Sequence, residues 1–438
     1  MEELASSTAG AGPTAGGAES PPEEPIDISE TARPAAGSLP EPVHTYLAEL
    51  AVAGSTEEAA AWLEEAVKSL RYALRHYGLD SRLRGQRLTP NAALIRLQGT
   101  DKLTISAVER RRTELLTSHG LHVIAVLPAK GEIVIMIARD QREILRLAGL
   151  WLRRQLPESA PLNNASFLLG AREDNGELFY LNLGGEFAGQ PQHGPHTLVA
   201  GETGSGKGVL TQNLLLDICA TNAPKNARIR LIDPKSGVDY PWLRGMPHLD
   251  GDIVTTQDGA VATFRELAEE MERRYRLIER AGARTIDSYN RRVGDAERLP
   301  RIYLVHDEIG DWMADKDHPD YRDAVDSYVE RLASKARAAG IHLLLITQRP
   351  DREAMPGRIK ANMNNKLCLR VSTRVNSEIV LDESGAERLL GSGHLAAKLA
   401  NERPMGEVGY VLLQVPFADE DECDELAIRI AEYWRGRG

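Results

Sequence analysis

Residues 201 to 208 read GETGSGKG and have the composition of a phosphate-binding loop. They follow the apolar run HTLVA and precede the periodic run VLTQNLLLDI, a pattern that predicts a strand, a glycine-rich turn and a helix. Such glycines let backbone N–H groups face phosphate oxygens, while the helix N-terminus and the lysine add positive potential. We therefore predict an ATP site formed by Gly201, Glu202, Thr203, Gly204, Ser205, Gly206, Lys207 and Gly208.

The last residue of this loop departs from the usual pattern. The position after the lysine normally carries Ser or Thr, whose hydroxyl binds Mg²⁺, but this chain has Gly208. Water could fill the vacant ligand position, or Thr211 could face the site from one helical turn further on. A third alternative is that hydrolysis is slow or absent. We favour a site that binds ATP with Mg²⁺ and still hydrolyses it.

A second apolar run, RIYLVHDE, ends in two carboxylates, Asp307 and Glu308. Ligands in α/β folds bind at the carboxyl ends of strands, so both side chains are placed where a nucleotide site would need them. Asp307 suits the metal, directly or through its water, and Glu308 suits the polarisation of an attacking water. Such a pair is common by itself and gains weight from the preceding phosphate loop. We expect His306 to be an ordinary strand residue.

A third apolar run, HLLLITQRP, also ends in polar side chains. Gln348 could sense the γ-phosphate and relay its presence to the rest of the chain. The alternative is that Gln348 is one of several polar residues that simply cap a strand end.

The elements that must position these residues follow an α/β pattern. From Pro195 onward, β-rich runs alternate with helical ones, which predicts a mainly parallel sheet covered on both faces. We assign residues 161–438 to this P-loop unit and residues 91–160 to a small α/β domain. Residues 43–90 are expected to be helical, with a capping box at Ser55 and Glu58 and a helix end near Gly78. Residues 1–42 are acidic, poor in large apolar side chains and expected to be disordered.

The composition excludes some classes of protein. The chain of 438 residues contains no apolar run long enough to span a bilayer and no signal peptide at its start, so we predict a cytoplasmic location without membrane contact. Its three cysteines, Cys219, Cys368 and Cys423, are widely spaced and are expected to be buried thiols. Residues 1–50 hold nine carboxylates and one arginine, so they account for −8 of the net charge of −11. The nearly neutral remainder does not argue against a nucleic-acid partner.

Seven blocks in the same order resemble the FtsK/SpoIIIE family, between about Asn91 and Gly393. They read HTLVAGETGSGKG, LIDPKSGVDY, MPHL, MERRYRLIERAGARTIDSYN, VHDEIGDW, KARAAGIHLLLITQRP and IKANMNNKLCLRVSTRVNSEIVLDESGAERLLGSGH. The resemblance implies a RecA-like P-loop motor that forms a ring, a homo-hexamer, around double-stranded DNA, with ATP bound between subunits. Residues 91–160 would be the smaller ring domain that precedes the motor.

The resemblance also implies roles for single residues. Lys207 and its loop would hold the phosphates, Asp307 and Glu308 would serve metal and water, and Gln348 would be the sensor. Arg337, in KARAAG, matches the position from which the family supplies an arginine finger to the neighbouring subunit. The alternative for Arg337 is a surface base in a basic run.

Three departures from the family limit the functional expectation: the missing membrane anchor, the missing orientation-reading module after the motor, and Gly208. We expect a DNA translocase that works with partner proteins in restriction, as in the DptH-type proteins of phosphorothioation systems, or in mobile-element transfer. The alternatives are a secretion or coupling ATPase with protein cargo, and a nucleotide-gated clamp that hydrolyses little.

Overall fold

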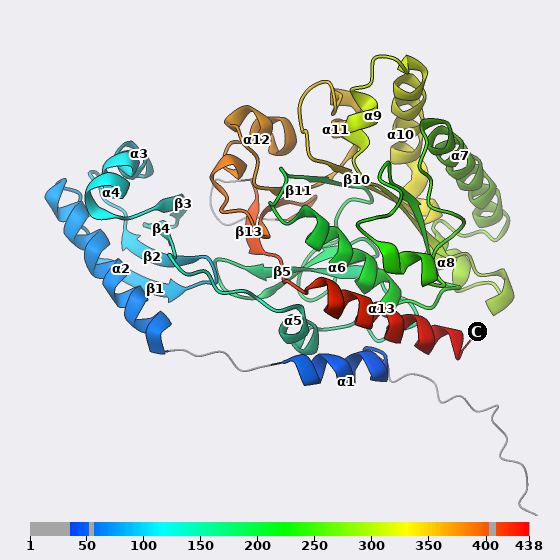
Figure 1. The fold of residues 1–438 in the computed structure, drawn as a ribbon, viewed down its shortest axis with the longest axis horizontal. Coiled ribbons are helices and arrows are strands. Elements are labelled where there is room, and N and C mark those ends of the chain that lie inside the picture. Colours follow the sequence, from blue (N-terminus) through cyan, green and yellow to red (C-terminus); the bar gives the residue numbers. More distant parts are fainter. Residues whose placement is uncertain (1–35, 52–56, 403–408, 438) are drawn as a thin grey trace, which may run out of the picture. The chain divides into compact units, whose positions relative to one another are not determined.

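The computed structural model describes residues 36–51, 57–402 and 409–437. Its larger sheet has nine strands in the order β6-β5-β13-β12-β11-β7-β10-β9-β8 (Figure 1). Five of them are parallel neighbours: β11 (Asn365–Leu369), β7 (Thr197–Ala200), β10 (Ile341–Thr347), β9 (Arg301–His306) and β8 (Ala227–Ile232). The others pair antiparallel: β6 (Leu178–Asn182), β5 (Ser166–Arg172), β13 (Val411–Gln414) and β12 (His394–Lys398). The sheet is thus mixed, whereas the sequence predicted a mainly parallel one.

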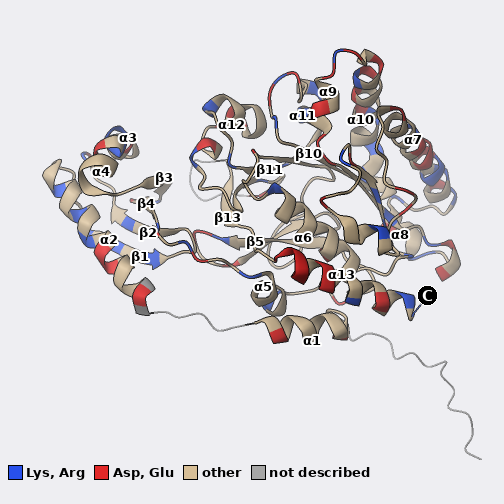
Figure 2. Cartoon of the chain, in the orientation of Figure 1, with Lys and Arg blue, Asp and Glu red and all other residues tan. Residues whose placement is uncertain are grey.

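Helices cover both faces of this sheet, as the alternation of apolar runs predicts (Figure 1). In β7, Val199 belongs to one core while Leu198 and Ala200 belong to the other. The Val199 core is closed by α1 (Glu41–Leu50), α5 (Leu147–Arg153), α6 (Lys207–Ala220) and α13 (Glu420–Arg435). The opposite core is closed by α7 (Gln257–Arg280), α9 (Ile309–Met313), α10 (Pro319–Ala339), α11 (Gly357–Asn362) and α12 (Arg374–Leu381). Acidic and basic residues are interspersed along the outer helix α7 (Figure 2).

Residues 57–138 form a second, four-stranded antiparallel sheet in the order β1-β2-β4-β3. Its strands are β1 (Leu83–Leu88), β2 (Ala92–Gln98), β3 (Val123–Ala129) and β4 (Glu132–Ala138). Three helices pack on it: α2 (Glu57–His76), α3 (Ile105–Arg110) and α4 (Arg112–His119). The predicted boundary at residue 91 falls between two paired strands, so the helix and strand before it belong to the same packed unit.

Most predicted elements of the sequence are present, and the differences have local causes. Strand β1 was missed because its sequence, LRGQRL, lacks an apolar alternation. The helical segment between β2 and β3 is divided into α3 and α4 at Arg111, and the helix after β4, α5, spans only Leu147–Arg153. Residues 1–35 of the expected tail and Ser55 of the expected capping box lie outside the described residues, while Glu41 begins α1.

The sequence also predicted the state of the three cysteines. All three thiols are free and buried, as predicted. None of the helices in the described ranges combines the length and the apolar character that crossing a bilayer requires.

Candidate nucleotide-binding site

The predicted phosphate loop connects β7 to the N-terminus of α6. Gly206 has a φ of 101°, and a Cβ at this position would lie 2.5 Å from the backbone N of Gly393. That N–H donates a 2.8 Å hydrogen bond to the carbonyl of Ser205. Only glycine at 206 allows this contact, because any side chain would collide with the neighbouring backbone. The backbone around Gly393 therefore packs against the phosphate loop and excludes a side chain at position 206. The loop sequence alone does not reveal this contact.

Glu308 lies directly beside the lysine of this loop. Its Oε2 is 3.9 Å from Lys207 Nζ, and its Oε1 accepts a 2.8 Å hydrogen bond from the backbone N–H of Gln348. The side chain is 2% exposed, and Oε2 has no hydrogen-bond partner in the described chain. Burial raises the pKa of Glu308, an effect that the Gln348 N–H and Lys207 partly offset. Glu308 thus has one anchored oxygen and one free oxygen, as a group that accepts a proton from water requires.

The backbone of Glu308 is strained, with φ 47° and ψ 43° in the left-handed region. This conformation costs a non-glycine residue on the order of 1 kcal/mol and persists only where the surroundings enforce it. It places the carboxylate at the carboxyl end of β9, where the chain turns into α9.

Asp307 is held by two donors. Its Oδ2 accepts a 2.9 Å hydrogen bond from the Tyr240 hydroxyl, and its Oδ1 accepts one of 2.9 Å from the backbone N–H of Glu308. Burial raises the pKa of Asp307, while Lys207 lowers it. Tyr240 ends the block LIDPKSGVDY, but its contact with Asp307 could not be predicted, because the two residues are 67 positions apart.

Gln348 also reaches the loop. Its side-chain oxygen accepts a 2.9 Å hydrogen bond from the Thr203 hydroxyl, and its backbone N–H donates to Glu308. A single residue therefore contacts both the loop and the carboxylate that lies beside the loop lysine.

The glycine at 208 leaves open space. Apart from its chain neighbours and the backbone of its own helix, no described heavy atom lies within 4 Å of the position that a Cβ of Gly208 would occupy. The Thr211 side chain is fully buried, and its hydroxyl donates a 3.0 Å hydrogen bond to the Lys207 carbonyl. The hydroxyl of Thr211 is thus engaged with its own helix and does not stand in the place of a missing Ser.

Arg337 lies away from these residues within the chain. It is exposed in the last turn of α10, just before Gly340 leads into β10. Gln348 follows the other end of β10, a strand of seven residues that spans roughly 20 Å. The structure therefore brings Lys207, Asp307, Glu308 and Gln348 together and leaves Arg337 at the opposite edge of the sheet.

A cavity of about 510 Å³ begins at the loop and extends away from the carboxylates. The loop and α6 contribute Gly204, Gly206 and Val209 to its wall. The rest is largely apolar and comes from distant segments, with Ile144, Leu145, Val415 and Phe417. Its size and lining suit a nucleobase with its ribose, which bind in mostly apolar pockets. Sequence reasoning did not identify this wall because its parts are up to 273 residues apart.

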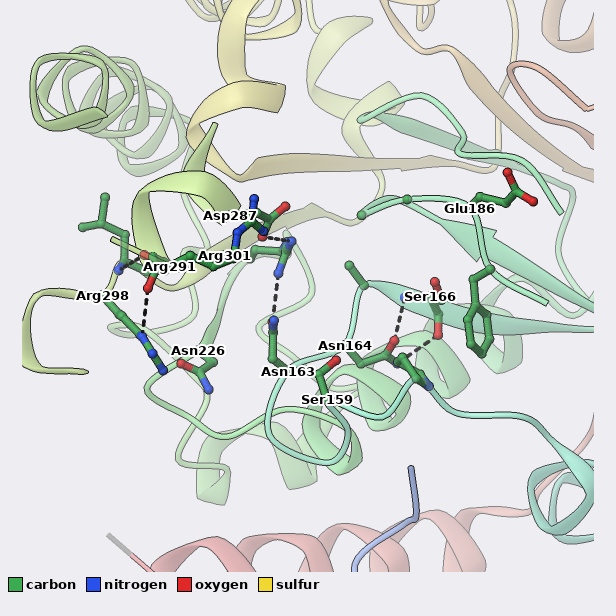
Figure 3. Close-up of a pocket in the computed structure, with 17 residues that line it drawn as sticks. Ser159, Asn163, Asn164, Ser166, Glu186, Asn226, Asp287, Arg291, Arg298 and Arg301 are labelled. Atoms are coloured by element: carbon green, nitrogen blue, oxygen red, sulfur yellow. Dashed lines mark hydrogen bonds and ion pairs between the residues drawn. The ribbon is translucent and has the colours of Figure 1, made fainter. Parts of the chain in front are cut away.

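A second cavity, of about 460 Å³, lies at the amino ends of β8, β9 and β5 and holds none of the predicted site residues (Figure 3). Arg301 dominates it, donating a 2.8 Å hydrogen bond to Asn163 and pairing with Asp287. Asn164 bonds the backbone of Ser166 in the same wall. The polar groups here are thus bonded to one another.

The donor set near the loop fits a Mg²⁺ ion carried by the nucleotide. Such an ion takes one or two protein carboxylates and completes its octahedral set with phosphate oxygens and water. Asp307 supplies a carboxylate, and the unpartnered Oε2 of Glu308 and Oγ of Ser205 are buried polar atoms at the same site. Among the described residues, no group of three or more His, Cys, Asp or Glu forms a metal site by itself.

Comparisons with known proteins show which family the chain resembles. A family model described as FtsK/SpoIIIE matches residues 184–352. DNA translocase FtsK of Campylobacter jejuni is 34% identical over 322 residues, which are 72% of this chain and 31% of that protein. DNA translocase FtsK of Pseudomonas aeruginosa is 30% identical over 408 residues, which are 86% of this chain and 46% of that protein. The chain therefore spans about a third to a half of the length of these relatives.

One solved structure extends the likeness to the fold. The conjugation coupling protein TcpA of pCW3, a monomer with ATPgS, superimposes with a TM-score of 0.53 at 23% identity. The match covers 83% of this chain and 98% of that one. It confirms the α/β motor fold that the sequence predicts.

Proposed function

Because the chain belongs to the FtsK/SpoIIIE family, we propose that it is an ATP-driven motor that moves double-stranded DNA. The observation that carries the hydrolytic part is the position of Glu308. One of its oxygens is fixed by the Gln348 N–H, and the other is free and 3.9 Å from the amine of Lys207. A γ-phosphate bound to that amine would lie beside a carboxylate that is placed to receive a proton.

Each residue of the site then has a defined task. The backbone N–H groups of the loop and Lys207 hold the phosphates, and Asp307 holds the metal, directly or through its water. Mg²⁺, when bound, neutralises charge on the phosphate oxygens. Glu308 orients the attacking water and takes up its proton. Gln348 contacts both Thr203 and Glu308 at the carboxyl end of β10. A change at the phosphates therefore alters the end of β10 and the loop that follows it.

The DNA-binding part is supported by the charges that follow β10 and β11. Four exposed arginines lie in these segments, on the same edge of the sheet as the phosphate loop: Arg349, Arg352, Arg358 and Arg374. The Arg358 and Arg374 side chains keep 76% and 72% of their surface exposed, although Arg358 lies 4.0 Å from Asp326 and Arg374 pairs with Glu378 at 2.7 Å. Guanidinium groups of this kind neutralise backbone phosphates without reading sequence. Binding should therefore weaken as salt rises.

The proposed assembly is a homo-hexameric ring. Arg337 is exposed and far from the site of its own chain, so it could complete only the site of a neighbour. A guanidinium that enters from outside stabilises the transition state only in the assembled ring. We further propose a cytoplasmic motor that serves a restriction or mobile-element transfer system together with partner proteins.

Measurement of ATP turnover with and without duplex DNA tests this function. Stimulation by DNA is expected for a translocase. Nucleotide binding without turnover would instead support the nucleotide-gated clamp that Gly208 makes a credible second candidate. Turnover that ignores DNA would favour a coupling ATPase with protein cargo.

A further inference from the structure

The chain lacks the hydroxyl that usually follows the loop lysine, yet Asp307 still accepts a hydrogen bond from a hydroxyl. The donor is Tyr240, which is 1% exposed and lies 2.9 Å from Asp307 Oδ2. The hydroxyl group therefore comes from the connection after β8 and not from the phosphate loop. Without it, Oδ2 would be a buried acceptor that has lost its donor, which destabilises a structure.

The connection after β8 is built to fix the position of Tyr240. Asp233, at the end of β8, is fully buried and accepts the backbone N–H groups of Lys235 and Gly237 at 2.8 and 2.6 Å. The N–H of Tyr240 donates to the Gly237 carbonyl at 3.1 Å, and the 3₁₀ helix Pro241–Gly245 follows directly. A tight turn before Tyr240 and a short helix after it thus fix the backbone position from which its side chain extends.

Tyr240 also touches the helix that begins at the loop. Burial raises the pKa of Tyr240, and the side chain of Thr211, whose hydroxyl donates to the Lys207 carbonyl, lies near enough to the Tyr240 hydroxyl to lower that pKa in part. Thr211 lies one helical turn beyond Lys207, directly after the turn that contains Gly208. The phenol group therefore donates to Asp307 from a position beside the first turns of α6, the helix on which a hydroxyl at position 208 would lie.

We propose that Tyr240 is a positioning residue that replaces the missing hydroxyl of position 208 by orienting Asp307 toward the metal of a bound nucleotide. This inference rests on the proposed nucleotide site but not on DNA translocation. It explains how the loop tolerates glycine: the metal ligand lost at 208 is left to water, while the orientation of the carboxylate is kept by another element.

Replacement of Tyr240 by Phe tests this role, because it removes one oxygen atom and keeps the ring. Binding of a fluorescent ATP analogue is measured while Mg²⁺ is titrated, and again in EDTA. We expect Tyr240→Phe to need about tenfold more Mg²⁺ for half-maximal binding, the loss typical of one hydrogen bond to a charged group. Binding in EDTA should change by less than about twofold, since the phosphate contacts of Lys207 remain.

Tyr303→Phe is the matched control. Tyr303 is a buried tyrosine of β9 whose hydroxyl has no hydrogen-bond partner within the described chain. Its replacement removes the same atom from the strand that leads to Asp307, and the Mg²⁺ requirement should stay that of the wild type. Thermal unfolding without ligand is followed for both variants, and a Tyr240→Phe chain that does not fold would assign the hydroxyl to folding and overturn the proposal.

Rescue by Gly208→Ser separates this role from a general structural one. The site is open above Gly208, so a serine fits without displacing any atom. In the Gly208→Ser background, Tyr240→Phe should raise the Mg²⁺ requirement by no more than about twofold, because the serine supplies the hydroxyl. An undiminished tenfold effect in that background, or no effect of Tyr240→Phe in the wild type, would overturn the proposal. A wild type that binds Mg²⁺ and nucleotide normally but ignores DNA would overturn only the translocase function.

Discussion

Two cavities of similar size but different lining lie at opposite ends of the strands of the nine-stranded sheet. The cavity beside the phosphate loop has about 510 Å³ and the one at the amino ends of the strands about 460 Å³. At the loop edge, Ser205 Oγ and Glu308 Oε2 are buried and have no hydrogen-bond partner among the described residues. Among the residues that line the opposite cavity, all of them described, none has such an atom, and Arg301 is bonded on two sides.

The two cavities thus differ in their unsatisfied polar groups and not in their volume. A buried polar group without a partner is costly, and at the loop edge a bound ligand would supply the missing partners. The strained backbone of Glu308 lies at the same edge and has the same implication. The following substitutions test whether nucleotide binding and hydrolysis depend on residues at the loop edge and not on those at the amino ends of the strands.

The largest effect is expected for Lys207→Ala. The change removes the amine that faces Glu308 and the phosphates but little buried volume, so the chain should fold while nucleotide-dependent activity falls by more than about 1,000-fold. Steady-state hydrolysis and nucleotide binding measure the loss, with the thermal unfolding curve as the control for folding. Turnover at the wild-type rate would show that the site is elsewhere.

Glu308→Gln should separate binding from chemistry. The amide can still accept the Gln348 N–H but cannot take up a proton, so ATP should bind normally while hydrolysis falls by about 100-fold or more. Single-turnover kinetics with bound ATP are the direct measurement. If hydrolysis persists, another carboxylate accepts the proton, and Asp311 is the nearest alternative in sequence.

Arg337→Ala tests whether the opposite edge acts on a neighbour. We expect normal ATP binding and turnover reduced by at least about 100-fold, the lower range for an arginine finger. Mixing this variant with Lys207→Ala subunits should restore part of the activity, because each subunit supplies what the other lacks. Rings verified as mixed that stay inactive would contradict a role in trans.

The pH profile should reflect the burial of Glu308. Because its pKa is raised above the ordinary 4.5, the carboxylate becomes protonated, and hydrolysis is lost, as pH falls through a value above 4.5. Below that value, the rate should fall by about tenfold per pH unit. A profile of kcat for wild type and Glu308→Asp locates this limb. An acid limb at or below pH 4.5 would contradict the assignment.

The smallest effect is expected at the amino edge of the sheet. Arg298 lines the second cavity, where it pairs with Asp295 and donates to the Asn290 carbonyl (Figure 3). Arg298→Ala should change nucleotide affinity and turnover by less than about twofold, as exposed ion pairs contribute little. It is also the matched control for Arg337→Ala. A large effect on ATP affinity would erase the contrast between the two edges.

The sequence by itself determined the α/β class, the loop with Lys207 and the strand ends with Asp307, Glu308 and Gln348. These features are local: glycine spacing, apolar runs of strand length and the polar residues that follow them can be recognised over a few residues. The sequence also predicted that Thr211 could face the metal, but the structure engages its hydroxyl with the Lys207 carbonyl.

Only the tertiary structure decided which distant groups complete the site. Tyr240 bonds Asp307, Gly393 contacts the loop, and Phe417 lines the apolar cavity beside the loop, and the sequence assigned none of them to the site. It also decided that the sheet turns antiparallel beyond β11. The physical reason is that hydrogen bonds and packing depend on distance in space, which strand order sets, and neither can be read from positions that lie tens or hundreds of residues apart.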